Sequence, residues 1–246
     1  MHSTLTFQAP SLALLATEPL RAVLEFCAVK LGQAQVVRGD GHPVIVYPGL
    51  GAGALTTAPL RAHLETCGFT VYDWELGVNT GPDGPFDGWL AGLVERVRQV
   101  QARHRRKVSL VGWSLGGVYA REVAKLCPRH VRQVVTLATP HRAIDDANHA
   151  GTIYRLFGGS TSQLTPELLA RLGECPPVPV TSVYSESDGV VCWRACLEEP
   201  GARAENIAVD ASHLGMPSHP EVLGIVAHRL AQRGGRWRPF KGRRAG

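Results

Sequence analysis

Cysteine is sparse in this sequence, and its spacing argues against two common classes of protein. Only six cysteines occur in 246 residues, and no two have the C-x2-C spacing of a structural zinc site. A chain of this length can also build a core without disulfide bonds. We therefore expect free, mostly buried thiols and no bound metal, as in a protein of the reducing cytoplasm.

Long apolar runs are absent as well. No stretch approaches the roughly 18 consecutive apolar residues of a membrane-spanning helix. The apolar run at residues 12–16 is short, has no basic region before it and is soon followed by Glu18, so it does not resemble a secretion signal. These features predict a cytoplasmic protein with no transmembrane segment.

An excess of one charge is missing from most of the chain. The formal net charge is +5, but six of the 26 basic residues lie within residues 233–246, where there is no acidic residue. Over the rest of the chain, 20 basic residues are balanced by 21 acidic ones, which gives no indication of nucleic-acid binding. We expect residues 234–246 to form a basic, flexible tail, with contact to an anionic surface as the alternative.

The chain does have enough apolar sequence for a sizeable core, because 44% of its residues are hydrophobic. Segments rich in β-forming residues alternate with helical ones. Strands are expected at residues 44–47, 69–74, 108–111, 131–138, 180–184 and 206–209, and helices at 59–67, 86–103, 118–126 and 221–232. The strands are continuously apolar, which predicts one α/β domain with about six mostly parallel strands and helices on both faces.

An N-terminal extension, residues 1–35, is predicted to contain a helix at 19–31, with Thr17 as its N-cap and Pro19 in its first turn. Apolar residues recur along it at helical spacing: Leu20, Val23, Leu24, Cys27 and Leu31. We expect this apolar face to pack against the rest of the domain, with a membrane or a partner protein as the alternative.

The segment after the fourth expected strand, residues 139–179, is too long for one simple crossover to the next strand. We expect it to contain short helices at 148–157 and 166–172. No linker in the sequence marks it as a separate domain.

Gly112-Trp113-Ser114-Leu115-Gly116 is the most informative motif of the chain. It follows the expected strand at 108–111 and precedes the expected helix at 118–126. A G-x-S-x-G sequence at such a junction is typical of a nucleophile elbow, a tight turn that strains the serine backbone and exposes its hydroxyl. Such a site requires a histidine, an acid and two backbone N–H donors.

Two residues at the ends of later strands supply the partners of the serine. In a parallel sheet, active groups lie beyond the carboxyl ends of the strands. Asp188 follows the fifth expected strand and His213 follows the sixth. We expect His213 to take the proton of Ser114 as general base and Asp188 to orient the imidazole. Asp210 and Glu186 are the alternative acids.

The two backbone donors of an oxyanion hole are expected on either side of the nucleophile. One is the N–H of Leu115, the residue after the serine. The other lies in the glycine-rich loop at 48–53, where the N–H of Leu50 is the first choice and that of Gly51 the second. Four residues are candidates for the substrate pocket: Gly49, Gly51, Trp113 and His141. Ordinary packing is the alternative for the tryptophan, and a surface or loop position for the histidine.

These motifs and their order resemble the α/β-hydrolases, in particular the small bacterial esterases and lipases, over residues 44–232. The resemblance implies an α/β-hydrolase fold with a small helical cap or lid at 139–179, and no cofactor. Thr139-Pro140-His141-Arg142 is similar to the T-P-H-R segment of several lipases. Pro48 departs from the pattern, because many lipases have histidine before the glycine of the oxyanion loop.

The residues and the resemblance together predict a serine hydrolase that cleaves small-molecule or lipid-like carboxylic esters through an acyl-serine intermediate. An acyltransferase, or a lipase or phospholipid deacylase with the same triad, is one alternative. A non-catalytic binding protein of the same fold is another. The sequence leaves the oligomeric state open.

Overall fold

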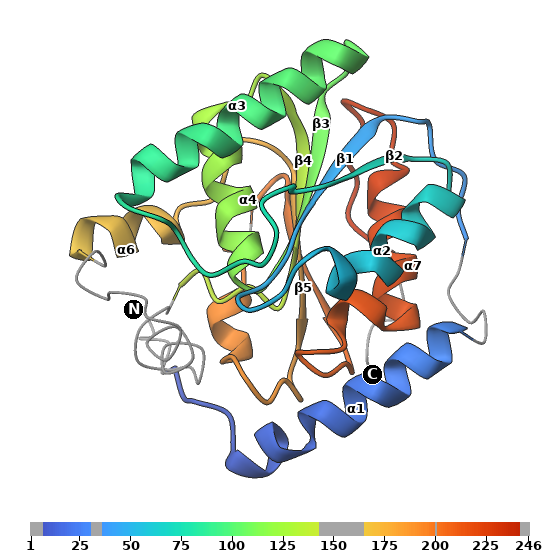
Figure 1. Ribbon diagram of the computed structural model, residues 1–246, viewed down its shortest axis with the longest axis vertical. Coiled ribbons are helices and arrows are strands. Elements are labelled where there is room, and N and C mark those ends of the chain that lie inside the picture. Colours follow the sequence, from blue (N-terminus) through green and yellow to red (C-terminus); the bar gives the residue numbers. More distant parts are fainter. Residues whose placement is uncertain (1–6, 31–35, 143–164, 200, 242–246) are drawn as a thin grey trace.

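Six parallel strands form one sheet at the centre of the molecule (Figure 1). The computed structural model describes residues 7–30, 36–142, 165–199 and 201–241. The strands are β1 (Pro43–Tyr47), β2 (Thr70–Asp73), β3 (Val108–Trp113), β4 (Val131–Leu137), β5 (Val180–Ser185) and β6 (Ala204–Val209). Every neighbouring pair is parallel, in the order β2-β1-β3-β4-β5-β6. This confirms the predicted number and direction of the strands.

The order of the strands places a topological switch point between β1 and β3. From β1 the chain moves to β2 at one edge, and from β3 it moves through β4 and β5 to β6 at the other edge. The connections that leave the carboxyl ends of β1 and β3 therefore run toward opposite faces, which opens a crevice between them. The glycine-rich loop at 48–53 and Ser114 lie at this point.

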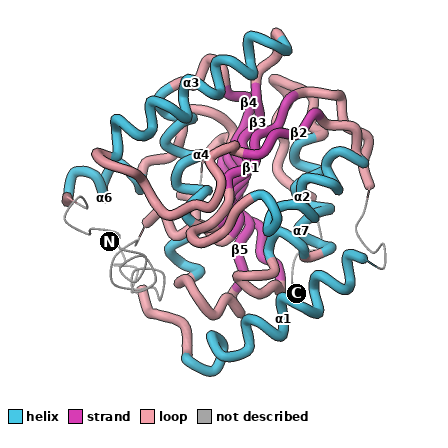
Figure 2. Tube along the Cα trace, in the orientation of Figure 1, coloured by secondary structure: helices cyan, strands magenta, loops and turns pink. Residues whose placement is uncertain are grey.

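Helices cover both faces of the sheet (Figure 2). On one face pack α2 (Ala54–Thr66) and α7 (Pro220–Leu230), and on the other α3 (Phe86–His104) and α4 (Leu115–Leu126). In β1, Val44 and Val46 belong to the core under α2 and α7, whereas Ile45 and Tyr47 belong to the core under α3 and α4. Burial on both faces explains the continuously apolar strands.

Two predicted helix starts were wrong for the same reason. The N-terminal helix α1 is Leu12–Lys30, so Pro19 lies well inside it, and α2 starts at Ala54, so Pro59 lies inside that helix too. Proline is common in the first turn but is not confined to it. Ser11, rather than Thr17, supplies the side-chain cap of α1, because its Oγ accepts the N–H of Leu14 at 3.3 Å.

The predicted packing of α1 is also wrong, because its apolar face points to solvent. Leu20 and Leu24 are 65% and 61% exposed. The side chains of α1 that hydrogen-bond to the domain are Glu18, Arg21 and Glu25, while Leu15 and Val29 are partly buried against the core. Glu18 and Glu25 accept backbone N–H groups of the loops after β5 and β6, and Arg21 donates to the carbonyl of Ser187 in the loop after β5. An apolar face cannot supply such partners.

After β4, the described part of the 139–179 segment contains one helix, α6 (Pro166–Gly173). Thr165 caps it by accepting the N–H of Leu168 at 3.2 Å, which confirms the predicted helix at 166–172. The other helix predicted in this segment, 148–157, lies outside the described residues. Two short 3₁₀ helices follow, η2 (Trp193–Cys196) and η3 (Met216–Ser218).

The first part of the basic tail packs against the domain instead of extending into solvent. The N–H of Phe240 donates to Glu205 at 2.6 Å, and the carbonyl of Arg238 accepts from Arg229 at 2.8 Å. Four of the six cysteines are buried, as the sequence predicted, and none of the six is disulfide-bonded. Among the helices of the described residues, none has the length and apolar character needed to cross a membrane.

Candidate active site

Ser114 occupies a strained turn between β3 and α4. Its backbone has φ 53° and ψ −123°, a conformation that a residue with a side chain rarely adopts. A Cβ at Gly112 would lie 2.4 Å from the carbonyl oxygen of Gly116, and a Cβ at Gly116 would lie 2.4 Å from that of Tyr47. The flanking glycines are therefore required by close backbone packing, as the G-x-S-x-G motif predicted.

A hydrogen-bonded series joins Ser114, His213 and Asp188. Nε2 of His213 lies 3.1 Å from Oγ of Ser114, and Nδ1 lies 2.8 Å from Oδ2 of Asp188. The three side chains come from the ends of β3, β6 and β5 and are almost completely buried. The structure thus brings together the three residues that the sequence selected, 99 and 25 positions apart from the histidine.

The loop after β5 fixes the carboxylate of Asp188. Its Oδ1 accepts the N–H groups of Val190 and Val191, each at 2.8 Å, which leaves Oδ2 for the imidazole. The two alternative acids lie elsewhere. The side chain of Asp210 is 90% exposed and pairs with an arginine, and Glu186 is exposed.

The surroundings of His213 change its affinity for a proton. Burial disfavours the imidazolium, but the negative charge of Asp188, its hydrogen bond and the charge of Glu18 outweigh burial, so the pKa of His213 is raised. A histidine in this position is suited to receive a proton from Ser114 and to hold the charge while the reaction proceeds.

The loop after β1 lies against the nucleophile. A Cβ at Gly49 would be 3.2 Å from Cβ of Ser114, a tight contact, so this loop lies directly beside the serine. The N–H of Gly51 is already donated to the carbonyl of Asn79 at 2.7 Å. Within the described part of the chain, the N–H of Leu50 has no acceptor, and that of Leu115 has none because it begins α4.

Asn79, which no sequence motif singles out, holds the loop after β1. Its side-chain amide donates to the carbonyl of Pro48 at 2.8 Å, and its backbone exchanges hydrogen bonds with Gly51 and Ala52. The side chain is fully buried, and its oxygen accepts from the hydroxyl of Tyr119. A lone asparagine within a glycine- and proline-rich region gives no sequence signal for this role.

The two remaining pocket candidates have defined packing positions. The indole N–H of Trp113 donates to the carbonyl of His213 at 3.0 Å, so this residue supports the histidine loop, the loop after β6 that carries His213. His141 is buried beside Glu198 and Arg121, and its Nδ1 lies 3.2 Å from the carbonyl of Thr139. Burial and the charge of Arg121 hold the pKa of His141 well below its usual value. No cluster of metal-binding side chains occurs in the described residues.

A second Ser–His–Asp arrangement exists at the opposite end of β3. Nδ1 of His42 lies 2.5 Å from Asp40 and its Nε2 lies 2.7 Å from Oγ of Ser109. Ser109 and His42 are completely buried, and Ser109 sits within β3 instead of a tight turn. Burial, partly offset by the Asp40 hydrogen bond, lowers the pKa of His42 to about 4. The arrangement therefore has no exposed nucleophile and is structural.

Comparison with known structures shows the same fold in lipases. Lipase B of Aspergillus fumigatus superposes with a TM-score of 0.62 over 82% of this chain and 55% of its own, at 16% identity. The mature lipase BlEst2 of Bacillus licheniformis has a TM-score of 0.59 over 81% of this chain and 97% of its own, also at 16% identity.

Sequence comparison finds relatives over part of the chain. Serine hydrolase BPHL of Mus musculus is 31% identical over 52% of this chain, and a triacylglycerol lipase of Pseudarthrobacter phenanthrenivorans is 37% identical over 44%. The chain spans 46% and 35% of the lengths of these two relatives. The sequence profile of the palmitoyl protein thioesterase family matches residues 43–176, more than half of the chain. With its parallel sheet and its elbow, the chain belongs to this family of α/β-hydrolases.

Proposed function

We propose that this protein is a serine hydrolase that cleaves carboxylic esters through an acyl-serine intermediate, with Ser114 as nucleophile, His213 as general base and acid, and Asp188 as the orienting acid. The observation that carries the proposal is the hydrogen-bonded series of these three residues at a strained elbow, directly beside the loop after β1. The serine hydrolase and lipase relatives support the same chemistry.

The proposed reaction has two halves that use the same groups. Oγ of Ser114 bonds to the ester carbonyl carbon while its proton passes to Nε2 of His213. The negative oxygen of the tetrahedral intermediate accepts hydrogen bonds from the N–H groups of Leu50 and Leu115. Breaking the bond to the alcohol oxygen releases the alcohol with the proton from His213. Water then bonds to the acyl carbon while its proton passes to His213. Breaking the bond to Oγ of Ser114 releases the acid, and the proton returns from His213 to the serine.

Small to medium acyl groups are the proposed substrates, and a thioester is the second candidate. The family name favours the thioester, and the acyl-serine step is the same whether oxygen or sulfur leaves. Matched p-nitrophenyl esters and thioesters with acyl chains of increasing length separate these two candidates. A steep rise in kcat/KM with long chains at a lipid interface would instead support a lipase or phospholipid deacylase.

Acyl transfer and a non-catalytic role make different predictions. An acyltransferase would divert the acyl group to an added alcohol or amine, which product analysis measures. A binding protein would neither turn over an ester nor react with a fluorophosphonate. The hydrogen-bonded Ser114, His213 and Asp188, together with the N–H groups of Leu50 and Leu115 beside them, go beyond what binding requires, which favours catalysis.

The decisive experiment compares two serines of β3 and its elbow. Ser114→Ala is expected to abolish p-nitrophenyl ester hydrolysis and fluorophosphonate labelling while the protein stays folded. Ser109→Ala is the matched control, because Ser109 also lies beside a histidine but is buried in the strand. It is expected to keep its activity per folded molecule. Near-wild-type hydrolysis by Ser114→Ala would contradict the proposal.

A further inference from the structure

The polar face of α1 is bound to the two loops that carry Asp188 and His213. Glu18, 1% exposed, accepts three backbone hydrogen bonds. Its Oε1 accepts the N–H of Gly189 at 2.8 Å and that of His213 at 3.0 Å, and its Oε2 accepts the N–H of Leu214 at 3.0 Å. One carboxylate therefore joins the residue after Asp188 to His213 itself.

A second carboxylate of α1 binds the residue before the histidine. Glu25 accepts the N–H of Ser212 at 2.7 Å and the hydroxyl of Ser212 at 2.6 Å. The same hydroxyl accepts the N–H of Gly215 at 3.0 Å. The backbone of the histidine loop is thus held on both sides of His213 by acceptors from a single helix.

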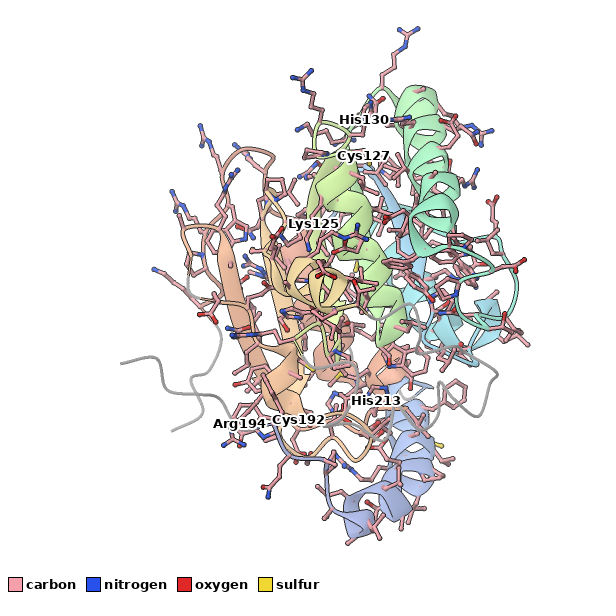
Figure 3. The ribbon with its side chains drawn as sticks, turned by 90° about the vertical axis from the view of Figure 1, so that its left-hand side faces the viewer. Lys125, Cys127, His130, Cys192, Arg194 and His213 are labelled. Carbon is pink, nitrogen blue, oxygen red and sulfur yellow. The ribbon has the colours of Figure 1, made fainter. Side chains whose placement is uncertain are left out.

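Two glycines provide the room that α1 needs. A Cβ at Gly189 would lie 2.6 Å from the carbonyl of Leu14, and a Cβ at Gly215 would overlap the carboxylate of Glu25. The backbone of α1 therefore lies directly against the loop after β5, which carries Asp188. Figure 3 shows His213 at the end of the molecule where α1 lies, far from Cys127 and His130 at the other end of α4.

We propose that Glu18, assisted by Glu25, is a positioning residue that fixes the relative placement of Asp188 and His213, so that α1 is a working part of the active site. This inference rests on the proposed function of the triad. Neither carboxylate touches the reacting atoms, and both act through the backbone of the loops.

The physical effect of Glu18 has two components. Its hydrogen bonds satisfy three backbone N–H groups, two of them buried, and hold the loops in place. A misplacement of about 1 Å in such a site costs on the order of 10²-fold in rate. Its negative charge also faces the imidazole. Among the described residues, the groups around His213 are Ser114, Asp188, the indole of Trp113 and Glu18, and the charges of Asp188 and Glu18 favour the imidazolium.

The test compares Glu18→Gln and Glu18→Asp with Glu95→Gln, an exposed glutamate of α3, as the matched control. In Glu18→Gln the amide N–H group faces a backbone N–H, and in Glu18→Asp the carboxylate is one methylene too short. Both are expected to lower kcat/KM on the order of 10²-fold. Only Glu18→Gln removes the charge, so only this variant is expected to shift the acid limb of the pH profile to lower pH.

Imidazole NMR titration of His213 supplies a readout that does not require turnover. The pKa of His213 is expected to fall in Glu18→Gln and to stay unchanged in Glu95→Gln. Wild-type kcat/KM and an unchanged pKa in Glu18→Gln would overturn the inference. So would a loss of activity with a lower Tm but the wild-type pKa, because that result indicates a structural role alone.

A second variant and the wild-type protein separate misfolding and failure of the proposed function from failure of the inference. If Glu18→Gln does not fold, Glu25→Gln replaces it and is expected to slow fluorophosphonate labelling of Ser114 roughly tenfold. A wild-type labelling rate in Glu25→Gln would then overturn the inference. If the wild-type protein is neither labelled nor active on any ester, the proposed function fails, while the titration still decides whether Glu18 acts on His213.

Discussion

At the scale of single residues, the same three side-chain types form two arrangements with different properties. Ser114 and Ser109 each lie within 3.1 Å of a histidine that is bound to an aspartate. They differ in backbone conformation, because one occupies a turn with positive φ beside a glycine loop and the other occupies the middle of a sheet. Side-chain identity therefore does not distinguish a proposed nucleophile from a core serine.

Asp188→Asn tests the orienting role of the acid. The amide oxygen can still accept the N–H groups of Val190 and Val191, so the fold should persist. The amide N–H would face Nδ1 of His213 and favour the tautomer in which Nε2 carries the proton, which prevents proton removal from Ser114. We expect kcat to fall on the order of 10⁴-fold.

The matched control for this change is Asp210→Asn. The side chain of Asp210 is 90% exposed and lies at the surface end of its ion pair with Arg21, so the variant should keep nearly full activity. Equal losses in the two variants, measured as kcat on one p-nitrophenyl ester, would contradict the assignment of Asp188.

The pH dependence of activity tests the raised pKa of His213. The base must be neutral to accept a proton, so activity is present above its pKa and is lost as the pH falls through it. Because the charges of Asp188 and Glu18 outweigh burial, the acid limb of kcat/KM is expected above the ordinary histidine value of about 6.5. An acid limb at or below that value, measured with a chromophore whose signal is corrected for pH, would contradict the expectation.

At the scale of elements, close backbone approach explains which glycines matter. The elbow brings the start of α4 against the end of β1, and there is no space for a side chain at Gly116. In α3, by contrast, nothing lies within 4 Å of the Cβ that would be added at Gly92. Glycine in a helix interior lowers stability without a compensating contact.

These two glycines make a matched pair of substitutions. Gly116→Ala is expected to destabilise the fold by about 1–3 kcal/mol or more and to slow fluorophosphonate labelling, because Tyr47 and Pro48 must move. Gly92→Ala is expected to stabilise it by up to about 1 kcal/mol. Urea unfolding at neutral pH measures both, and a harmless Gly116→Ala would contradict the close packing of the elbow.

At the scale of the whole molecule, the candidate site is built from four loops at the carboxyl ends of the parallel strands. Because all strands are parallel, the carboxyl ends of β1, β3, β5 and β6 lie on the same side of the sheet, where α1 lies against the loops after β5 and β6 (Figure 1). The opposite end holds buried groups that affect stability instead, with His42 between Asp40 and Ser109.

Acid sensitivity of the fold follows from this second group. Burial lowers the pKa of His42 to about 4, whereas the unfolded chain protonates near the ordinary value of 6.5. Between these values the unfolded state binds more protons, so stability falls as the pH falls, by up to about 3 kcal/mol for this residue.

Urea unfolding between pH 7 and pH 4 measures this loss, with His42→Gln as the comparison. The variant cannot take up that proton, so its stability should change less with pH than that of the wild-type protein. Parallel curves for the two proteins would contradict the role of His42. His141 is buried and contributes in the same direction in both proteins.

Local patterns in the sequence predicted much of the fold and selected the residues of the candidate site. Continuously apolar strands separated by helices predicted the six-stranded parallel sheet, because such strands are stable only when both faces are covered. The elbow motif, with an aspartate and a histidine after later strands, led to Ser114, Asp188 and His213, since the carboxyl ends of parallel strands meet at one edge.

Tertiary structure decided what depends on contacts between distant residues. Glu18 and His213 are 195 positions apart, so no local pattern indicates that α1 turns its polar face inward and leaves Leu20 and Leu24 exposed. Likewise, only the packed structure commits the N–H of Gly51 to Asn79 and buries Ser109 within β3. The sequence determined the chemistry available at the edge of the sheet, and tertiary structure decided which groups are free to perform it, because hydrogen-bond partners and burial are properties of the folded chain.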